Sequence, residues 1–149
     1  MPSPRYWREI PSRYRLEASR CGCGKVSYPP RKVCPGCQGT SAELIELSHS
    51  ARVVTYTVVH VPPADFMMEA PIALAIVETP EGARMMVQVV DCDPDQVHTG
   101  MDVSLEFRLI RKEGKGGILC YGHKAVPSHP IGEEATPEAS AAEAEVAHA

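Results

Sequence analysis

The sequence predicts a mainly β protein in which a short cysteine-rich unit precedes a small barrel of five strands. Four of the six cysteines lie within residues 21–37, as two tight pairs in turns rich in Gly and Pro. From residue 48 onward, segments rich in Val, Ile, Thr and Tyr recur at roughly ten-residue spacing, which favours a sandwich or a closed barrel. These segments are 51–61, 72–78, 84–90, 103–110 and 118–126.

The first residues predict a short helix. Ser3 and Pro4 suit the N-cap and the first helical position, and aromatic and apolar residues follow at helical spacing. Pro11 interrupts this pattern, so we expect a kink followed by one more turn. The helix either packs on the protein's own surface or docks onto a partner, because aromatic residues and Arg often anchor interfaces. The residues expected at such an interface are Tyr6, Trp7, Ile10 and Tyr14.

The four clustered cysteines predict a metal site on two turns. Strands at 15–20 and 25–28 form a hairpin whose turn carries Cys21 and Cys23, and a second turn carries Cys34 and Cys37. Two disulfides would need an oxidising compartment, and a thioredoxin-like pair would need a single C-x-x-C at the start of a helix. Four thiolates at tetrahedral angles suit one zinc ion, and iron is the alternative.

The first cysteine pair is a C-x-C, one residue shorter than the usual zinc knuckle. If this short spacing kept Cys21 from reaching the metal, the fourth ligand would come from elsewhere, for example from a histidine. If all four thiolates bind, no coordination position stays open for a reactive water, and the zinc is structural.

Three regions follow from these patterns. Residues 1–47 form the helix and a rubredoxin-like zinc ribbon, and residues 48–131 form a five-stranded barrel of the size of an OB fold. Residues 132–149 are rich in Ala and Glu and are expected to be disordered. The break at 93–100 is expected to form one helical turn. The break at 62–71 either covers the barrel or contacts a partner through Phe66, Met67 and Met68.

Charge and composition limit the functional classes. Residues 1–40 carry a net charge of +6, whereas residues 41–131 carry −5. No signal peptide or membrane span is predicted, so we expect a cytoplasmic protein. An acidic barrel region with few aromatic residues argues against a module that binds single-stranded nucleic acid, which is the alternative function for a zinc ribbon and an OB fold.

Several motifs resemble one protein family. They are "RYWREI", "RCGCGKVSYPPRKVCPGC", "DPDQVHTGMDVSLEFR" and "YGHKAVP", spread over most of residues 4–127. The chain resembles the zinc-ribbon and OB-fold proteins that accompany thiolases and other acyl-CoA enzymes, long described as a domain of unknown function. Two features depart from the family pattern: the C-x-C pair, and His123 and Ala125 in place of aromatic residues.

The resemblance implies a non-catalytic scaffold subunit of an acyl-CoA-condensing complex. Its partner would be a thiolase-like acetyl-CoA acetyltransferase, joined in some archaea by a hydroxymethylglutaryl-CoA synthase around a shared acyl-CoA path. The reactive cysteine would then belong to the partner, and no catalytic residue is expected in this chain. If the chain touches the CoA phosphates, the candidate residues are Lys25, Arg31 and Lys32.

Overall fold

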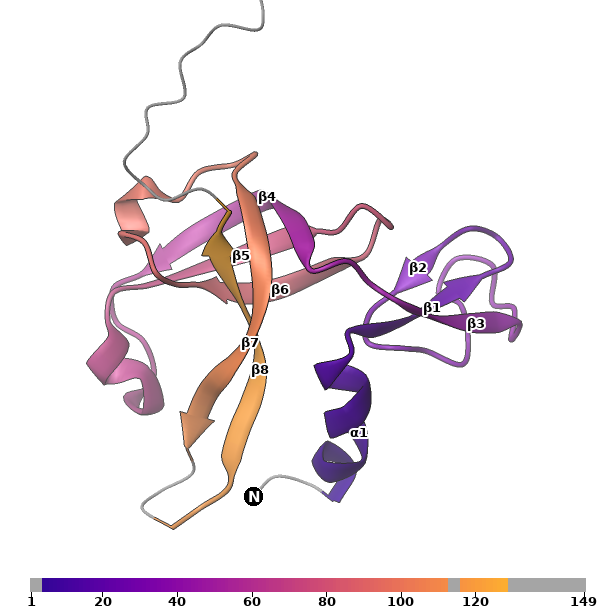
Figure 1. Ribbon diagram of the computed structural model, residues 1–149, viewed down its shortest axis with the longest axis horizontal. Coiled ribbons are helices and arrows are strands. Elements are labelled where there is room, and N and C mark those ends of the chain that lie inside the picture. The colour runs from indigo at the N-terminus through magenta and orange to yellow at the C-terminus, as the bar shows by residue number, and fades with distance from the viewer. Residues whose placement is uncertain (1–3, 113–115, 129–149) are drawn as a thin grey trace, which may run out of the picture.

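The computed structural model confirms a mainly β fold with one short N-terminal helix and a closed five-stranded barrel (Figure 1). It describes residues 4–112 and 116–128, with side chains from residue 8 onward. The predicted tail at 132–149 lies outside these described residues. Figure 1 shows the barrel on one side and a small three-stranded sheet on the other, with the helix below and between them.

The helix α1, Pro4–Tyr14, runs without interruption through Pro11. The turn expected after Pro11 is therefore present, and the helix does not end at the proline. Pro11 lies near the C-terminal end, where the missing N–H removes one hydrogen bond only, and its carbonyl still accepts from the N–H of Arg15 at 3.1 Å. An ion pair between Glu9 and Arg13, four residues apart and 2.8 Å in length, supports the same turns.

The cysteine-rich unit is built on a sheet of three short strands in the order β2-β1-β3. β1 (Glu17–Cys21) and β2 (Val26–Ser27) are the two strands of the expected hairpin. β3 (Ala42–Glu46) was not predicted, because its sequence AELIE does not alternate and all its residues but one are exposed. Only its antiparallel pairing with β1 makes it a strand.

The barrel has the strand order β4-β5-β6-β8-β7, and it closes through the pairing of β4 with β7. All neighbouring strands are antiparallel except β6 and β8, which pair in parallel at Val89 and Ala125 only. The five predicted strands are thus confirmed. They are β4 (Ser50–Val59), β5 (Ile72–Glu78), β6 (Arg84–Val89), β7 (Asp102–Lys112) and β8 (Leu119–Pro127).

Two short 3-10 helices lie in the longer connections of the barrel. η1 (Ala64–Glu69) follows β4, and η2 (Pro94–Gln96) precedes β7. η2 is the helical turn expected within 93–100, and the Asp93 carboxylate caps it by accepting from the N–H of Asp95 at 3.2 Å.

One hydrophobic core joins the barrel to the ribbon. Its interior is made of small and β-branched residues, so the five strands can close tightly around it. Leu16 and Leu47, from either side of the ribbon sheet, belong to the same core and are linked by a backbone hydrogen bond of 3.1 Å. The ribbon is therefore held to the barrel by shared apolar burial as well as by the chain.

Leu105 provides a test of this core, because it lies inside the barrel with an exposed fraction of 0%. We expect Leu105→Ala to lower the free energy of unfolding by about 2–5 kcal/mol, since a cavity would replace the lost side chain. Urea unfolding followed by circular dichroism measures this. Met86→Ala is the matched control, because Met86 lies on β6 with an exposed fraction of 74%. Equal losses in the two variants would contradict the assignment.

Candidate metal centre and docking face

The first cysteine pair lies on a tight turn between β1 and β2. The N–H of Cys21 donates to the carbonyl of Lys25 at 3.0 Å, and the N–H of Gly24 donates to the carbonyl of Cys21 at 2.8 Å. Gly24 has a φ of +85°, a conformation that residues with a Cβ rarely adopt. The turn therefore depends on glycine at this position.

The second pair lies on a turn closed in a similar way. The N–H of Cys34 donates to the carbonyl of Gly39 at 2.9 Å, and the N–H of Gln38 donates to the carbonyl of Cys34 at 3.0 Å. The N–H of Gly36 also points at the Cys34 sulfur, at 3.4 Å. This backbone donor favours the negatively charged form of the thiol.

All four sulfurs converge on one point. They lie within 4.8 Å of one another, with 3.4 Å between the sulfurs of Cys21 and Cys37 and 3.6 Å between those of Cys23 and Cys34. In a tetrahedral site with zinc–sulfur bonds of about 2.3 Å, neighbouring sulfurs are about 3.8 Å apart. The donor set fits zinc, and the short C-x-C pair does not keep Cys21 out of the cluster.

The thiols influence one another strongly. The N–H groups of Cys37 and Gly36 lower the pKa of Cys34 to about 6. The N–H of Cys23 also lowers the pKa of Cys21, but the neighbouring sulfurs, Cys37 first, and burial outweigh it and raise this pKa to about 12. A divalent ion between the four sulfurs would supply positive charge that stabilises their thiolate forms.

A zinc ion in this centre would have a structural role. Zinc bound here would hold the two turns together through four sulfurs and would keep no open position for a substrate or a water. Cys120 and Cys92 lie outside the cluster. The Cys120 side chain is buried within β8, and Cys92 is half-buried after β6.

The predicted contact residues of α1 are partly described. The side chains of Tyr6 and Trp7 lie outside the described part of the structure, although their backbone belongs to α1. Ile10 and Tyr14 are exposed, and the Tyr14 ring also meets the edge of Phe107 on β7 at a centroid distance of 5.2 Å. The helix thus rests on the barrel and still presents apolar surface.

The predicted contact residues of η1 differ in exposure. Met67 and Met68 are exposed, Met68 by 98%, whereas Phe66 is half-buried. The turn is fixed to the barrel by Asp65, which pairs with Arg111 at 3.3 Å, and by Glu69. Glu69 accepts from the side chain of Gln88 at 2.9 Å.

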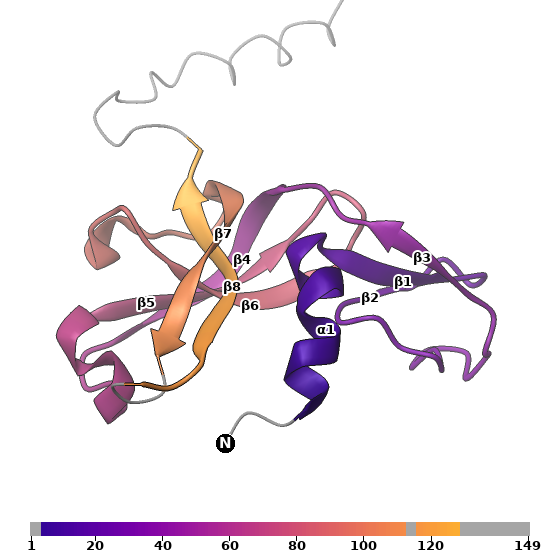
Figure 2. The same cartoon turned by 60° about the horizontal axis from the view of Figure 1, so that its bottom comes forward.

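Two segments with exposed apolar side chains, α1 and η1, flank the strands β7 and β8. Figures 1 and 2 both show them on either side of these strands, in the lower half of the view. We call their exposed apolar residues together the docking face, which consists of Ile10, Tyr14, Met67 and Met68.

An aromatic group under α1 was missed by the sequence analysis. The Phe107 ring stacks on Tyr121 at 5.8 Å and meets His123 at 5.2 Å. Phe107 and His123 are register partners two residues beyond the buried pair Leu105 and Ala125, so they continue the inward face of the barrel. The alternation of apolar residues along 103–109 was the signal that could have revealed them.

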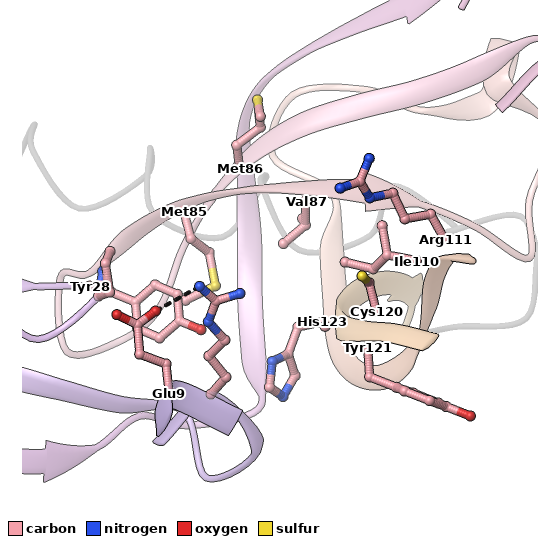
Figure 3. A pocket seen from close by; sticks show the side chains of 13 residues that line it. Glu9, Tyr28, Met85, Met86, Val87, Ile110, Arg111, Cys120, Tyr121 and His123 are labelled. Carbon is pink, nitrogen blue, oxygen red and sulfur yellow. Dashed lines mark hydrogen bonds and ion pairs between the residues drawn. The ribbon is translucent and has the colours of Figure 1, made fainter. Parts of the chain in front are cut away.

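A groove of about 670 Å³ opens beside this aromatic group, between α1, Tyr28, β6 and the β7–β8 hairpin (Figure 3). Its wall includes Met85, Ile110 and His123, and the Glu9–Arg13 ion pair lies at its edge. The Nε2 atom of His123 is buried and has no hydrogen-bond partner. Burial, and then the charge of His49, lower the pKa of His123 to about 4.

The three residues predicted as candidates to contact CoA phosphates do not all line the same cleft. Lys25 and Arg31 line a second cleft, of about 590 Å³, between the ribbon and the β5–β6 turn, and Lys32 is not part of its lining. The cleft also contains the Arg84–Glu78 ion pair and Glu81, whose carboxylate accepts from Ser48. The cleft is thus of mixed charge.

Comparison with known proteins identifies the family. Residues 8–43 match the rubredoxin-like zinc ribbon domain of ChsH2, and residues 44–108 match the C-terminal OB-fold domain of ChsH2. The chain belongs to the ChsH2, or DUF35, family. The resemblance inferred from the motifs is confirmed, as is the assignment of a zinc ribbon with one structural zinc ion.

Relatives carry related names. The chain is 47% identical over 125 residues to a "DUF35 domain-containing scaffold protein" of Methanocaldococcus jannaschii, covering 83% of this chain and 89% of that one. It is 27% identical over 110 residues to the benzoylsuccinyl-CoA thiolase subunit BbsA of Thauera aromatica, covering 73% and 74%. The family thus contains proteins named as scaffolds and a named subunit of a thiolase.

A solved structure has the same fold. The structure called Ltp2-ChsH2(DUF35) aldolase superposes with a TM-score of 0.64 and 28% identity, covering 87% of this chain and all of the matched chain, 100%. The only α-helix among the described residues, α1, is too short to cross a membrane.

The metal site makes a prediction about zinc content. Purified protein should carry one zinc ion per chain, and Cys34→Ala should bring the zinc content well below one and loosen the ribbon, because three thiolates do not complete the coordination. Metal analysis and proteolysis of the ribbon measure this. Cys120→Ser is the control, because this buried thiol lies on β8, and loss of zinc in that variant would contradict the assignment.

The burial of His123 predicts how the free energy of unfolding depends on pH. Its folded-state pKa of about 4 lies below the ordinary 6.5, so the unfolded chain takes up a proton first. The stability that the folded protein has because His123 is neutral is fully present above pH 6.5 and is lost as pH falls towards 4. Urea unfolding at several pH values should show a smaller loss for His123→Phe than for wild type. Identical pH profiles would show that His123 is not a buried neutral histidine.

Proposed function

We propose that this chain is a non-catalytic scaffold subunit that binds a thiolase-like, acyl-CoA-condensing enzyme. The observation that carries the proposal is the docking face, the set of apolar side chains exposed on α1 and η1. Tyr14 is exposed by 61% and Met67 by 58%, so both side chains are accessible to a partner.

The chemistry of the chain supports a role without catalysis. Among the residues that the structure describes, the four cysteines form the only group suited to hold a metal ion, and their four sulfurs complete its coordination. The barrel interior is filled by small apolar side chains, so it offers no substrate chamber. A subunit of this kind contributes shape and contacts, and the partner contributes the reactive groups.

The identity of the partner is inferred from the relatives. One relative is named as a thiolase subunit, and the similar solved structure is named as an aldolase with ChsH2. These names support a thiolase-like partner for this chain. We propose an acetyl-CoA acetyltransferase as that partner, with a hydroxymethylglutaryl-CoA synthase as the second enzyme of the complex. Arg31, on the cleft between the ribbon and the barrel, is the best-placed candidate to contact a CoA phosphate.

The adaptable part of the interface is expected to be η1. Methionine side chains are flexible and polarisable, so Met67 and Met68 can fit an irregular partner surface. The ion pair of Asp65 with Arg111 holds the turn in place while its methionines stay exposed. On α1, Tyr6 and Trp7 would provide the larger aromatic contacts, which are the residue types that most often dominate binding energy.

Co-expression with the thiolase from the same organism tests the proposal. We expect the two proteins to purify together, and Met68→Asp to weaken the complex at least about tenfold, because a charge would be buried at the interface. Size-exclusion chromatography and titration of one protein with the other measure this. Leu44→Asp is the matched control, because Leu44 is 65% exposed on β3 of the ribbon, away from the docking face. A stable monomer that ignores the thiolase would refute the proposal.

A further inference from the structure

Lys25 is held beside the metal centre by the first cysteine turn. Its carbonyl accepts from the N–H of Cys21, and it directly follows Gly24, whose left-handed conformation turns the chain back. The backbone of Lys25 is therefore fixed by the same turn that carries two of the sulfurs. The turn thereby also sets the direction in which the Lys25 side chain leaves the backbone.

The side chain of Lys25 lies across the second cysteine turn. A Cβ on Gly36 would be 3.2 Å from Cδ of Lys25 and 3.9 Å from its ammonium nitrogen. The same position is 3.7 Å from the sulfur of Cys34. The ammonium is therefore no farther from this sulfur than the Debye length of about 8 Å at physiological salt. The lysine stem is thus packed against the backbone of the second cysteine turn.

The negative charge of the zinc centre is the reason why the position of the Lys25 ammonium matters. Four thiolates and one Zn²⁺ have a net charge of −2, and a nearby fixed cation lowers the energy of such an anionic group. Among the described residues, Lys25 takes part in no ion pair, so its charge is not neutralised by a carboxylate. Arg84, across the same cleft, is by contrast paired with Glu78 at 2.8 Å.

We propose that Lys25 is the outer-sphere counter-charge of the four-thiolate zinc site. Lys25 binds no metal itself. It stabilises the charged thiolates, together with the N–H of Gly36 that points at Cys34. This assigns the Lys25 charge to the protein's own metal centre and leaves Arg31 as the cation of the cleft that is available to a ligand. The inference is independent of the proposed partner.

Zinc affinity at fixed pH tests the assignment without any enzyme assay. The full chain is titrated against a chromophoric zinc chelator at low and at high salt. We expect Lys25→Met to weaken zinc binding by about threefold to tenfold at low salt, and the difference to shrink at high salt, because salt screens the charge. Lys25→Arg is expected to keep most of the wild-type affinity, since the charge is retained.

Lys32→Met is the matched control, because it removes the same charge from an exposed position of the ribbon that does not line the cleft. An equal effect of the two Met variants would show that only net charge matters and would overturn the proposal. So would a Lys25→Met variant that binds zinc like wild type at low salt.

Discussion

The convergence of four sulfurs at one point is the constraint on which the N-terminal third of this protein depends. Between residues 22 and 41, Cys34 is the only buried side chain, and β2 has only two residues. A segment that buries so little apolar surface cannot be held by the hydrophobic effect. The metal centre takes the place of a core there, and its binding free energy becomes folding free energy for the ribbon.

The ribbon in turn fixes α1 and the start of the barrel. Leu16, directly before β1, and Leu47, directly after β3, meet in the common core. The helix therefore leaves the ribbon at a defined place and lies against β7, where Tyr14 meets Phe107. Metal binding, core packing and the position of a surface helix are in this way parts of one structural unit, although the helix contributes nothing to the metal site.

The barrel serves as a rigid support for the surfaces that we propose to bind a partner protein. Its interior is closed by Ala and Val side chains, and its inward face continues beyond the closed part as Phe107, Tyr121 and His123. These rings pack on one another and on α1, so they are not free platforms for stacking bases, which argues against the nucleic-acid alternative. The exposed apolar residues of α1 and η1 lie at the periphery, where a partner protein can reach them.

The sequence by itself determined the features that depend on local signals. The cysteine spacing with its Gly and Pro turns predicted the zinc ribbon, and alternating apolar segments predicted five barrel strands. Tertiary structure alone decided that β3 is a strand, that Cys21 joins the cluster despite the short C-x-C, and that Lys25 lies over Gly36. It also decided that α1 packs on β7, where Tyr14 meets Phe107. The reason is physical: turns and strand periodicity are set by neighbouring residues, whereas these features arise from contacts between segments distant in the chain.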